Sequence, residues 1–255
     1  MSILGPKRRK IERLHFVLAG AQKSGTTALH YFLSKHPDIT MGDQQEIHFF
    51  DDDKIFSGPV DYALLHRHYP PLTESMIAGD CTPAYLYWKP AMERISNYNP
   101  AIKLLALLRN PTDRAFAHWN MQRFKGREPL DFLEAVKAES ERAKALTPQE
   151  QRRFAYVTRG RYAEQLQRVF DLFPREQVKV IKSEEFGDRN QETLNSVFQF
   201  LGVPAISIPR NKDRNVVPYE RPITSEEREY LRAIFAEDIS NLERMLNWDC
   251  ADWKL

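Results

Sequence analysis

Short apolar runs alternate with segments of helical periodicity along most of the chain. Apolar runs of strand length occupy residues 16–20, 76–80, 102–108 and 178–181. The run at 102–108 is continuous rather than alternating, which is typical of a central parallel strand covered on both faces. Segments with helical spacing separate the runs, and we expect helices ending near residue 37 and at 59–69, 88–98, 112–124, 160–173, 190–201 and 225–246. This alternation predicts an α/β fold in which helices flank a central parallel sheet.

The loop after the first apolar run has the spacing of a phosphate-binding loop. Gly20 and Gly25 stand as in the G-x-x-x-x-G-K-[ST] motif, whose backbone amides and following helix N-terminus bind an anion. Thr26 replaces the lysine of the ATP-binding loop, and the nearby cation is Lys23, inside the turn. The spacing predicts a P-loop NTPase-like three-layer domain, while the replacement of the lysine by Thr26 disfavours ATP chemistry. A strand-to-helix turn that needs glycines only for its backbone angles would show the same spacing.

Charged side chains follow three of the predicted strands. Lys23, Asp80 and Arg109 each come just after an apolar run. Ligands of parallel sheets bind beyond the carboxyl ends of the strands, so we expect these residues at one rim. Asp80 could imitate the carboxylate that holds Mg²⁺ in ATP-dependent P-loop enzymes, which keeps a kinase or ATPase open as an alternative.

A short segment at 42–51 alternates apolar and polar residues. If this segment is extended, Glu46 and His48 point to the same side, because successive side chains of a strand point to opposite faces. On that condition, the alternation places these two polar side chains on one face of the segment.

Composition favours one domain of ordinary size. The 255 residues are 42% hydrophobic, enough to bury a large core, so we expect a single domain over 1–255 with a basic tail at 1–12. Residues 126–153 are rich in charge, and we expect them to form a helical insertion on the surface. Lys+Arg 37 against Asp+Glu 35 gives a net charge of +2, which argues against a general nucleic-acid partner.

Cysteine content and the lengths of the apolar runs bear on the compartment. Cys81 and Cys250 are too few for a disulfide framework, and we expect two free thiols in a reducing compartment. The apolar run after the basic tail is too short for a signal peptide, and no later run approaches membrane-spanning length. We therefore expect a soluble, cytoplasmic protein. No set of His, Asp and Glu residues has metal-ligand spacing, so we expect no metal.

Several stretches, in order, resemble the motifs of one enzyme family. AQKSGTT at 21–27, EIHFFD at 46–51 and LRNPTDRAFAH at 108–118 are similar to motifs of sulfotransferases that use 3′-phosphoadenosine 5′-phosphosulfate (PAPS). The resemblance is strongest to the branch with heparan sulfate N- and O-sulfotransferases and their bacterial relatives. Weaker similarities lie at 79–85, 160–166 and 198–204. The resemblance implies metal-free transfer of a sulfuryl group from PAPS, with release of 3′,5′-adenosine bisphosphate (PAP).

The resemblance also implies which residues hold the donor. Lys23 would neutralise charge on the transferring group, and Arg109 would bind the 3′-phosphate. The 5′-phosphosulfate would lie on the loop residues Ser24, Gly25, Thr26 and Thr27. The family usually has a serine, a second 3′-phosphate ligand, where this sequence has Ala117. Either a basic residue replaces that serine, with His118, Arg114, Lys212 and Arg214 as candidates, or the 3′-phosphate is held less tightly.

On the acceptor side, the resemblance makes Glu46 the base that takes the acceptor proton. His48 would orient the acceptor or share the proton transfer, although a histidine beside two phenylalanines is as often a packed core residue. Asp51 and Tyr85 would contact the acceptor, while Asp51 taken alone is typical of a turn or helix cap. Cys81 stands where heparan-type enzymes often have lysine, which argues against a highly sulfated acceptor.

These motifs predict an enzyme that sulfates a hydroxyl, less favourably an amine, of a carbohydrate, glycolipid or smaller alcohol. Two other functions stay open from the sequence. One is the P-loop kinase or ATPase, and the other is a non-catalytic module that binds a nucleotide.

Overall fold

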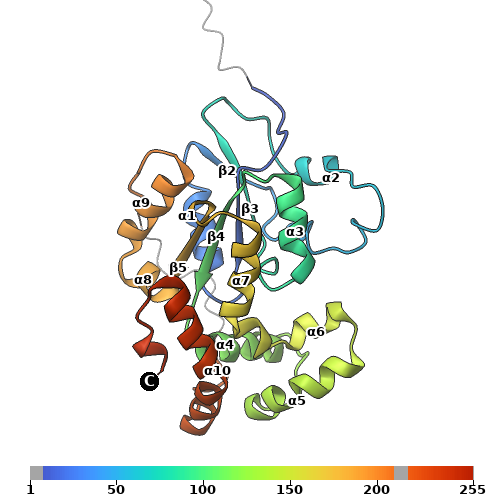
Figure 1. Ribbon diagram of the computed structural model, residues 1–255, viewed down its shortest axis with the longest axis vertical. Coiled ribbons are helices and arrows are strands. Elements are labelled where there is room, and N and C mark those ends of the chain that lie inside the picture. The colour runs from blue at the N-terminus through green and yellow to red at the C-terminus, as the bar shows by residue number, and fades with distance from the viewer. Residues whose placement is uncertain (1–7, 210–217, 255) are drawn as a thin grey trace, which may run out of the picture. The chain divides into compact units, whose positions relative to one another are not determined.

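The computed structural model describes residues 8–209 and 218–254 (Figure 1). The chain forms two compact units. One comprises Met1–Leu107 and Arg168–Asn211, and the other comprises Leu108–Gln167 and Lys212–Leu255. In the part of the chain that the structure describes, no helix is both long enough and apolar enough to cross a membrane. Lys212 and Arg214, which the sequence nominated for the donor phosphate, lie outside the described residues.

A five-stranded sheet forms the centre of the first unit, in the order β2-β3-β1-β4-β5 (Figure 1). The pairings of β1 with β3, β1 with β4 and β2 with β3 are all parallel. The strands are β1 (Phe16–Gly20), β2 (Ile39–Met41), β3 (Ile77–Cys81), β4 (Lys103–Leu108) and β5 (Val178–Lys182). Every residue of β1 is buried, as a central strand covered on both faces requires. The predicted α/β fold with a central parallel sheet is confirmed.

Helices α1 (Thr26–Leu33) and α9 (Asn190–Leu201) pack on the same apolar cluster as the strands β1 and β4. Leu29 of α1 and Phe198 of α9 are fully buried in this cluster, with Leu105 of β4. Figure 1 shows α3 (Lys89–Tyr98) on the other side of the sheet. Two shorter helices complete this unit, α2 (Ala63–His66) and α8 (Ser183–Asp188), and the boundary with the second unit falls within α7 (Tyr162–Leu172).

The second unit contains α4 (Pro111–Phe124), α5 (Phe132–Ala145), α6 (Pro148–Phe154) and α10 (Ser225–Leu246). Short 3₁₀ turns lie at Thr158–Gly160 and Ala251–Trp253 here, and at Arg175–Gln177 in the first unit. The Asn110 side chain accepts from two amides at the start of α4, where Pro111 occupies the first turn. The helices predicted at 88–98, 112–124, 190–201 and 225–246 are confirmed as α3, α4, α9 and α10, to within one residue at each end.

Three segments differ from their predictions. The helix predicted at 59–69 is limited to α2, at Ala63–His66. The segment at 42–51 is not a strand, because Glu46 and His48 adopt left-handed backbone angles with φ of 62° and 57°. The insertion at 126–153 is not confined to the surface, since Phe132 is fully buried and its ring meets that of Phe116 edge-to-face at 5.1 Å. The apolar face of the helix that begins at Phe132 could have predicted this packing, but the high density of charged residues in the segment favoured a surface location.

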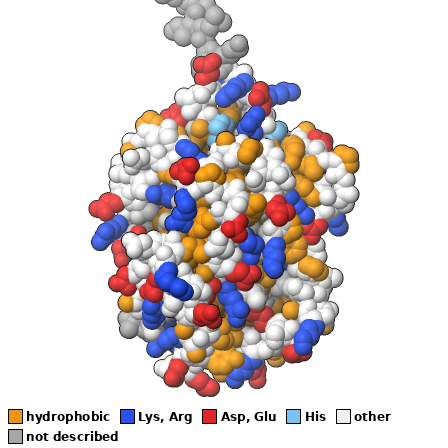
Figure 2. Space-filling model, viewed as in Figure 1, with side chains coloured by type: hydrophobic (Ala, Val, Ile, Leu, Met, Phe, Trp, Pro, Cys, Tyr) orange, Lys and Arg blue, Asp and Glu red, His pale blue; other side chains and the backbone are white. Residues whose placement is uncertain are grey.

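Acidic and basic side chains are interspersed over the face in view in Figure 2. This distribution agrees with the net charge of +2 of the whole sequence. Neither sign of charge dominates that face.

Candidate functional site

The predicted phosphate loop joins β1 to α1 in the first unit. Gly25 immediately precedes α1 with a φ of 95°, and Lys23 also has a positive φ, of 69°. The Ala21 amide donates to the Leu107 carbonyl of β4 at 2.7 Å, which fixes the start of the loop to the sheet. The first amides of an α-helix have no partner within the helix, so those at the start of α1 are available to an anion. The backbone thus has the shape that the sequence predicted for this loop.

Ser24 provides a test of whether the loop suits an anionic group. Its side chain is fully buried, and its Oγ has no hydrogen-bond partner among the described residues. A buried hydroxyl without a partner is unfavourable, and an anion seated on the loop would supply an acceptor. Ser183, which the sequence analysis did not single out, donates its hydroxyl to the Ser24 carbonyl at 2.9 Å and supports the loop from α8. The loop residues therefore fit a phosphate or phosphosulfate.

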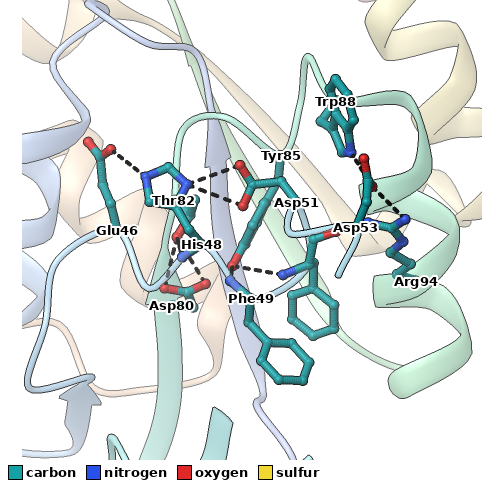
Figure 3. A network of polar contacts seen from close by, with 11 residues as sticks. Glu46, His48, Phe49, Asp51, Asp53, Asp80, Thr82, Tyr85, Trp88 and Arg94 are labelled. Atoms are coloured by element: carbon teal, nitrogen blue, oxygen red, sulfur yellow. Dashed lines mark hydrogen bonds and ion pairs between the residues drawn. The ribbon is translucent and has the colours of Figure 1, made fainter. Parts of the chain in front are cut away.

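Glu46 and His48 lie on an irregular segment at residues 45–50 of the same unit, which we call the turn (Figure 3). His48 Nε2 is 3.4 Å from a Glu46 carboxylate oxygen, and His48 Nδ1 is 3.0 Å from Asp51 Oδ2. The Glu46 and His48 side chains are about half exposed, whereas that of Asp51 is 1% exposed. The two polar side chains lie together, but not through the extended strand on which the sequence expectation depended, because the backbone adopts left-handed angles at both residues.

The carboxylates on either side hold His48 in its charged form. The hydrogen bond to Asp51 and then that to Glu46 raise the pKa of His48 to about 10, against the opposing effect of burial. Both ring nitrogens of the charged imidazole are donors, so His48 cannot take a proton near neutral pH. Within this turn, the group able to act as a base is therefore Glu46.

Asp51 and Tyr85 differ from the predicted acceptor contacts. Tyr85 has no exposed surface, and its hydroxyl accepts from the Phe49 amide at 3.1 Å and from the Phe50 amide at 3.4 Å. Asp51 is also buried and bonds to His48. Both side chains are thus buried under the turn and stabilise it, and neither is exposed to an acceptor that binds from solvent.

The turn and the phosphate loop contact each other directly. Gln45 Nε2 donates to Thr27 Oγ1 at 3.1 Å, and the Glu46 amide donates to the Cys81 carbonyl at 3.0 Å. The Cys81 thiol in turn lies 4.0 Å from the Thr26 carbonyl. A half-exposed carboxylate therefore stands beside an anion-binding loop.

The remaining nominated residues lie in the second unit. Arg109 follows β4 and is half-buried, and its carbonyl accepts from the Tyr162 hydroxyl at 2.9 Å. Ala117 is 2% exposed within α4. Arg114 and His118 are fully buried, and Arg114 donates to the Tyr156 carbonyl, so neither is presented to solvent as a substitute for the missing serine.

Both cysteines are buried free thiols, as predicted. Burial is also the main reason why the pKa of the Cys81 thiol is raised. Among the residues that the structure describes, no group of three or more His, Cys, Asp or Glu side chains could hold a metal ion.

Comparison with known proteins assigns the family. The sulfotransferase domain family matches residues 13–216. The chain belongs to the sulfotransferase family. A crystal structure of a sulfotransferase from Alicyclobacillus acidocaldarius is 30% identical and superposes with a TM-score of 0.82, over 96% of this chain and 100% of that one. The assignment favours a sulfotransferase enzyme over the kinase, the ATPase and the non-catalytic module that the sequence left open.

Curated relatives of this sulfotransferase include two human enzymes. The bifunctional heparan sulfate N-deacetylase/N-sulfotransferase 2 is 28% identical over 207 residues, which are 77% of this chain and 23% of that protein. The heparan sulfate glucosamine 3-O-sulfotransferase 5 is 29% identical over 188 residues, 74% of this chain and 53% of the relative. The chain thus spans about a quarter of the first relative and about half of the second. A mouse sulfotransferase solved with PAP shares the fold at 16% identity, with a TM-score of 0.57.

Proposed function

We propose that this sulfotransferase takes its sulfuryl group from PAPS and transfers it to a hydroxyl of a carbohydrate or related alcohol. One observation carries the proposal: the turn that bears Glu46 is bonded to the loop that suits a phosphosulfate, through Gln45 and Thr27. A base next to an anion-binding loop is what transfer from an anionic donor to a hydroxyl requires. The heparan sulfate sulfotransferases among the relatives favour a carbohydrate acceptor.

The donor supplies a sulfuryl group that is activated as an anhydride with phosphate. The loop amides at the start of α1 and the hydroxyls of Ser24, Thr26 and Thr27 hold its 5′ end. Lys23 neutralises the negative charge that develops on the bridging oxygen between phosphorus and sulfur as the bond from this oxygen to sulfur breaks.

Glu46 accepts the proton of the acceptor hydroxyl as the acceptor oxygen bonds to sulfur. His48 donates from Nε2 to the Glu46 carboxylate and from Nδ1 to Asp51, which fixes the ring and orients the base. In this mechanism His48 supplies charge and orientation rather than proton transfer, because both of its nitrogens already carry protons.

Arg109 is proposed to read the 3′-phosphate of the donor, and binding calorimetry tests this role. Arg109→Ala should weaken PAP binding by about tenfold or more and leave adenosine 5′-monophosphate unchanged, because only PAP carries a 3′-phosphate. Arg127→Ala removes an exposed arginine of the same unit and serves as the control. Equal losses for both nucleotides in the Arg109 variant would contradict this assignment.

A further inference from the structure

Asp80 is a buried carboxylate that the proposed chemistry leaves without a role. It lies at the end of β3 and is 1% exposed. The Thr82 hydroxyl donates to its two oxygens at 3.2 and 3.3 Å, and the Tyr85 hydroxyl and the Cys81 amide donate to it as well. A buried carboxylate is costly unless it is hydrogen-bonded, and a network with this many donors fixes the positions of the groups that take part in it.

The hydroxyls of Thr82 and Tyr85 link Asp80 to the backbone of the turn through hydrogen bonds (Figure 3). The Thr82 oxygen accepts from the His48 amide at 3.5 Å, and the Tyr85 oxygen accepts from the Phe49 amide at 3.1 Å. An amide can only donate, so each hydroxyl must accept from the turn and direct its single proton elsewhere. Asp80 is the acceptor for both protons.

The turn needs such support because its backbone is strained. Glu46 and His48 are not glycines, yet they have φ values of 62° and 57°. Side chains make these angles unfavourable, and they persist only where the surrounding structure imposes them. The amides of His48 and Phe49, just after Glu46 in the chain, are the ones that donate to Thr82 and Tyr85.

We propose that Asp80 is a positioning residue whose ionised carboxylate, acting through Thr82 and Tyr85, fixes the turn that carries Glu46 and His48. The catalytic meaning of this role rests on the proposed function. The role itself concerns the geometry of the turn, which can be measured without any substrate.

The charge state of Asp80 should control this arrangement. Burial raises the pKa of Asp80 to about 6, while the hydrogen bonds from Tyr85 and Thr82 oppose the rise. The ionisable groups that face it are His48 on the turn, Tyr69 after α2, and Cys81 and Tyr85 around the end of β3. Protonation removes the charge that strengthens the hydrogen bonds from the two hydroxyls and turns one carboxyl oxygen into a donor, so the turn should loosen as the pH falls through about 6.

The pKa of His48, measured by NMR titration of its ring, reports on the turn. The loss of the Asp80 charge also lowers this pKa, and the Thr82 variants described below keep that charge and so separate the two effects. In Asp80→Asn an NH₂ donor replaces one of the two carboxylate oxygens, so the hydrogen bond from Thr82 to that oxygen is lost and the remaining neutral oxygen accepts more weakly than a carboxylate. His48 should then leave its place between the two carboxylates, and its pKa should fall by about one unit or more from about 10. Asp52→Asn, at an exposed aspartate that accepts from the Lys54 amide, should leave the pKa of His48 unchanged. A folded Asp80→Asn protein whose His48 still titrates near 10 would overturn the proposal.

A second pair of variants decides the matter if Asp80→Asn does not fold. Thr82→Val removes the hydroxyl and keeps the volume, whereas Thr82→Ser keeps the hydroxyl. The His48 pKa should fall in the valine variant and stay near its original value in the serine variant. Equal pKa values in these two proteins would show that the hydroxyl does not transmit the effect.

Turnover supplies a separate readout. Asp80→Asn should lower kcat by about ten- to a hundredfold with little change in the KM for PAPS, because Asp80 is buried and its substitution acts by displacing the base. If the wild-type protein transfers no sulfuryl group at all, the proposed function fails, while the His48 titration still decides the role of Asp80.

Discussion

Replacing Asp80 by asparagine should flatten the pH dependence of the free energy of unfolding. Burial raises the pKa of this carboxyl from 3.8 to about 6 in the folded protein. The shift is about two units, and each unit corresponds to about 1.4 kcal/mol, so the group contributes a change of about 3 kcal/mol.

The sign of this change follows from proton binding. Between pH 3.8 and about 6 the folded state binds the proton more tightly than the unfolded chain. The stabilising contribution is therefore complete below pH 3.8 and is lost as the pH rises through about 6. Above that pH the folded protein must keep a buried negative charge, which asparagine removes.

Urea unfolding at pH steps from 4 to 8, on wild type and Asp80→Asn, measures this contribution. The unfolding free energy of the variant minus that of wild type should rise by about 3 kcal/mol over the range, because contributions from distant groups cancel in the difference. His48, with a pKa of about 10, titrates above this range. A difference that stays constant from pH 4 to 8 would refute the reasoning. The same variant should have a lower turnover, although its stability relative to wild type should be higher at pH 8 than at pH 4.

Four further substitutions test individual residues. Lys23→Ala should leave the fold intact and lower kcat by about a hundredfold, or about 3 kcal/mol in the barrier; near-normal turnover would remove its proposed role. Glu46→Gln should bind PAP as wild type does and lose transfer, so a parallel fall in PAP affinity by calorimetry would make Glu46 structural. Asp51→Asn should lower the pKa of His48, since Asp51 is the main cause of its elevation, and an unchanged NMR titration would disprove this. Gln45→Ala should reduce kcat several-fold, because it removes the hydrogen bond between the turn that carries Glu46 and the phosphate loop. Gln44→Ala, at the exposed neighbouring residue, should leave kcat unchanged. Equal rates for the two variants would contradict a role for this hydrogen bond.

Much of the fold could be predicted because local signals agreed with tertiary packing. The helix at 225–246 begins at a capping box between Thr224 and Glu227 and ends at Asn247 in a left-handed conformation. The continuous apolar run at 102–108 identified a central strand, β4. Strand β2 was missed because it is only three residues long and its backbone pairing with β3 has no signal in a single short segment.

The sequence predicted the shape of the phosphate loop but not the geometry of the segment that carries Glu46 and His48. The glycine spacing placed Lys23 on the loop, whereas alternation at 42–51 suggested a strand where the structure has left-handed backbone angles. No glycine marks the left-handed positions, so the sequence gives no warning of them. The support from Asp80 also depends on contacts between residues more than 30 positions apart, which periodicity cannot reveal.

Transfer of radioactive sulfur from labelled PAPS tests the central claim most directly. Purified protein would be incubated with ³⁵S-PAPS and a panel of oligosaccharides, glycolipids and simple alcohols, with Glu46→Gln as the matched control. We predict that wild type moves the label to at least one hydroxyl-bearing acceptor and releases an equal amount of PAP, while the variant binds PAP and transfers no label. Transfer by Glu46→Gln at the wild-type rate, or binding of PAP by wild type without transfer to any acceptor, would contradict the account.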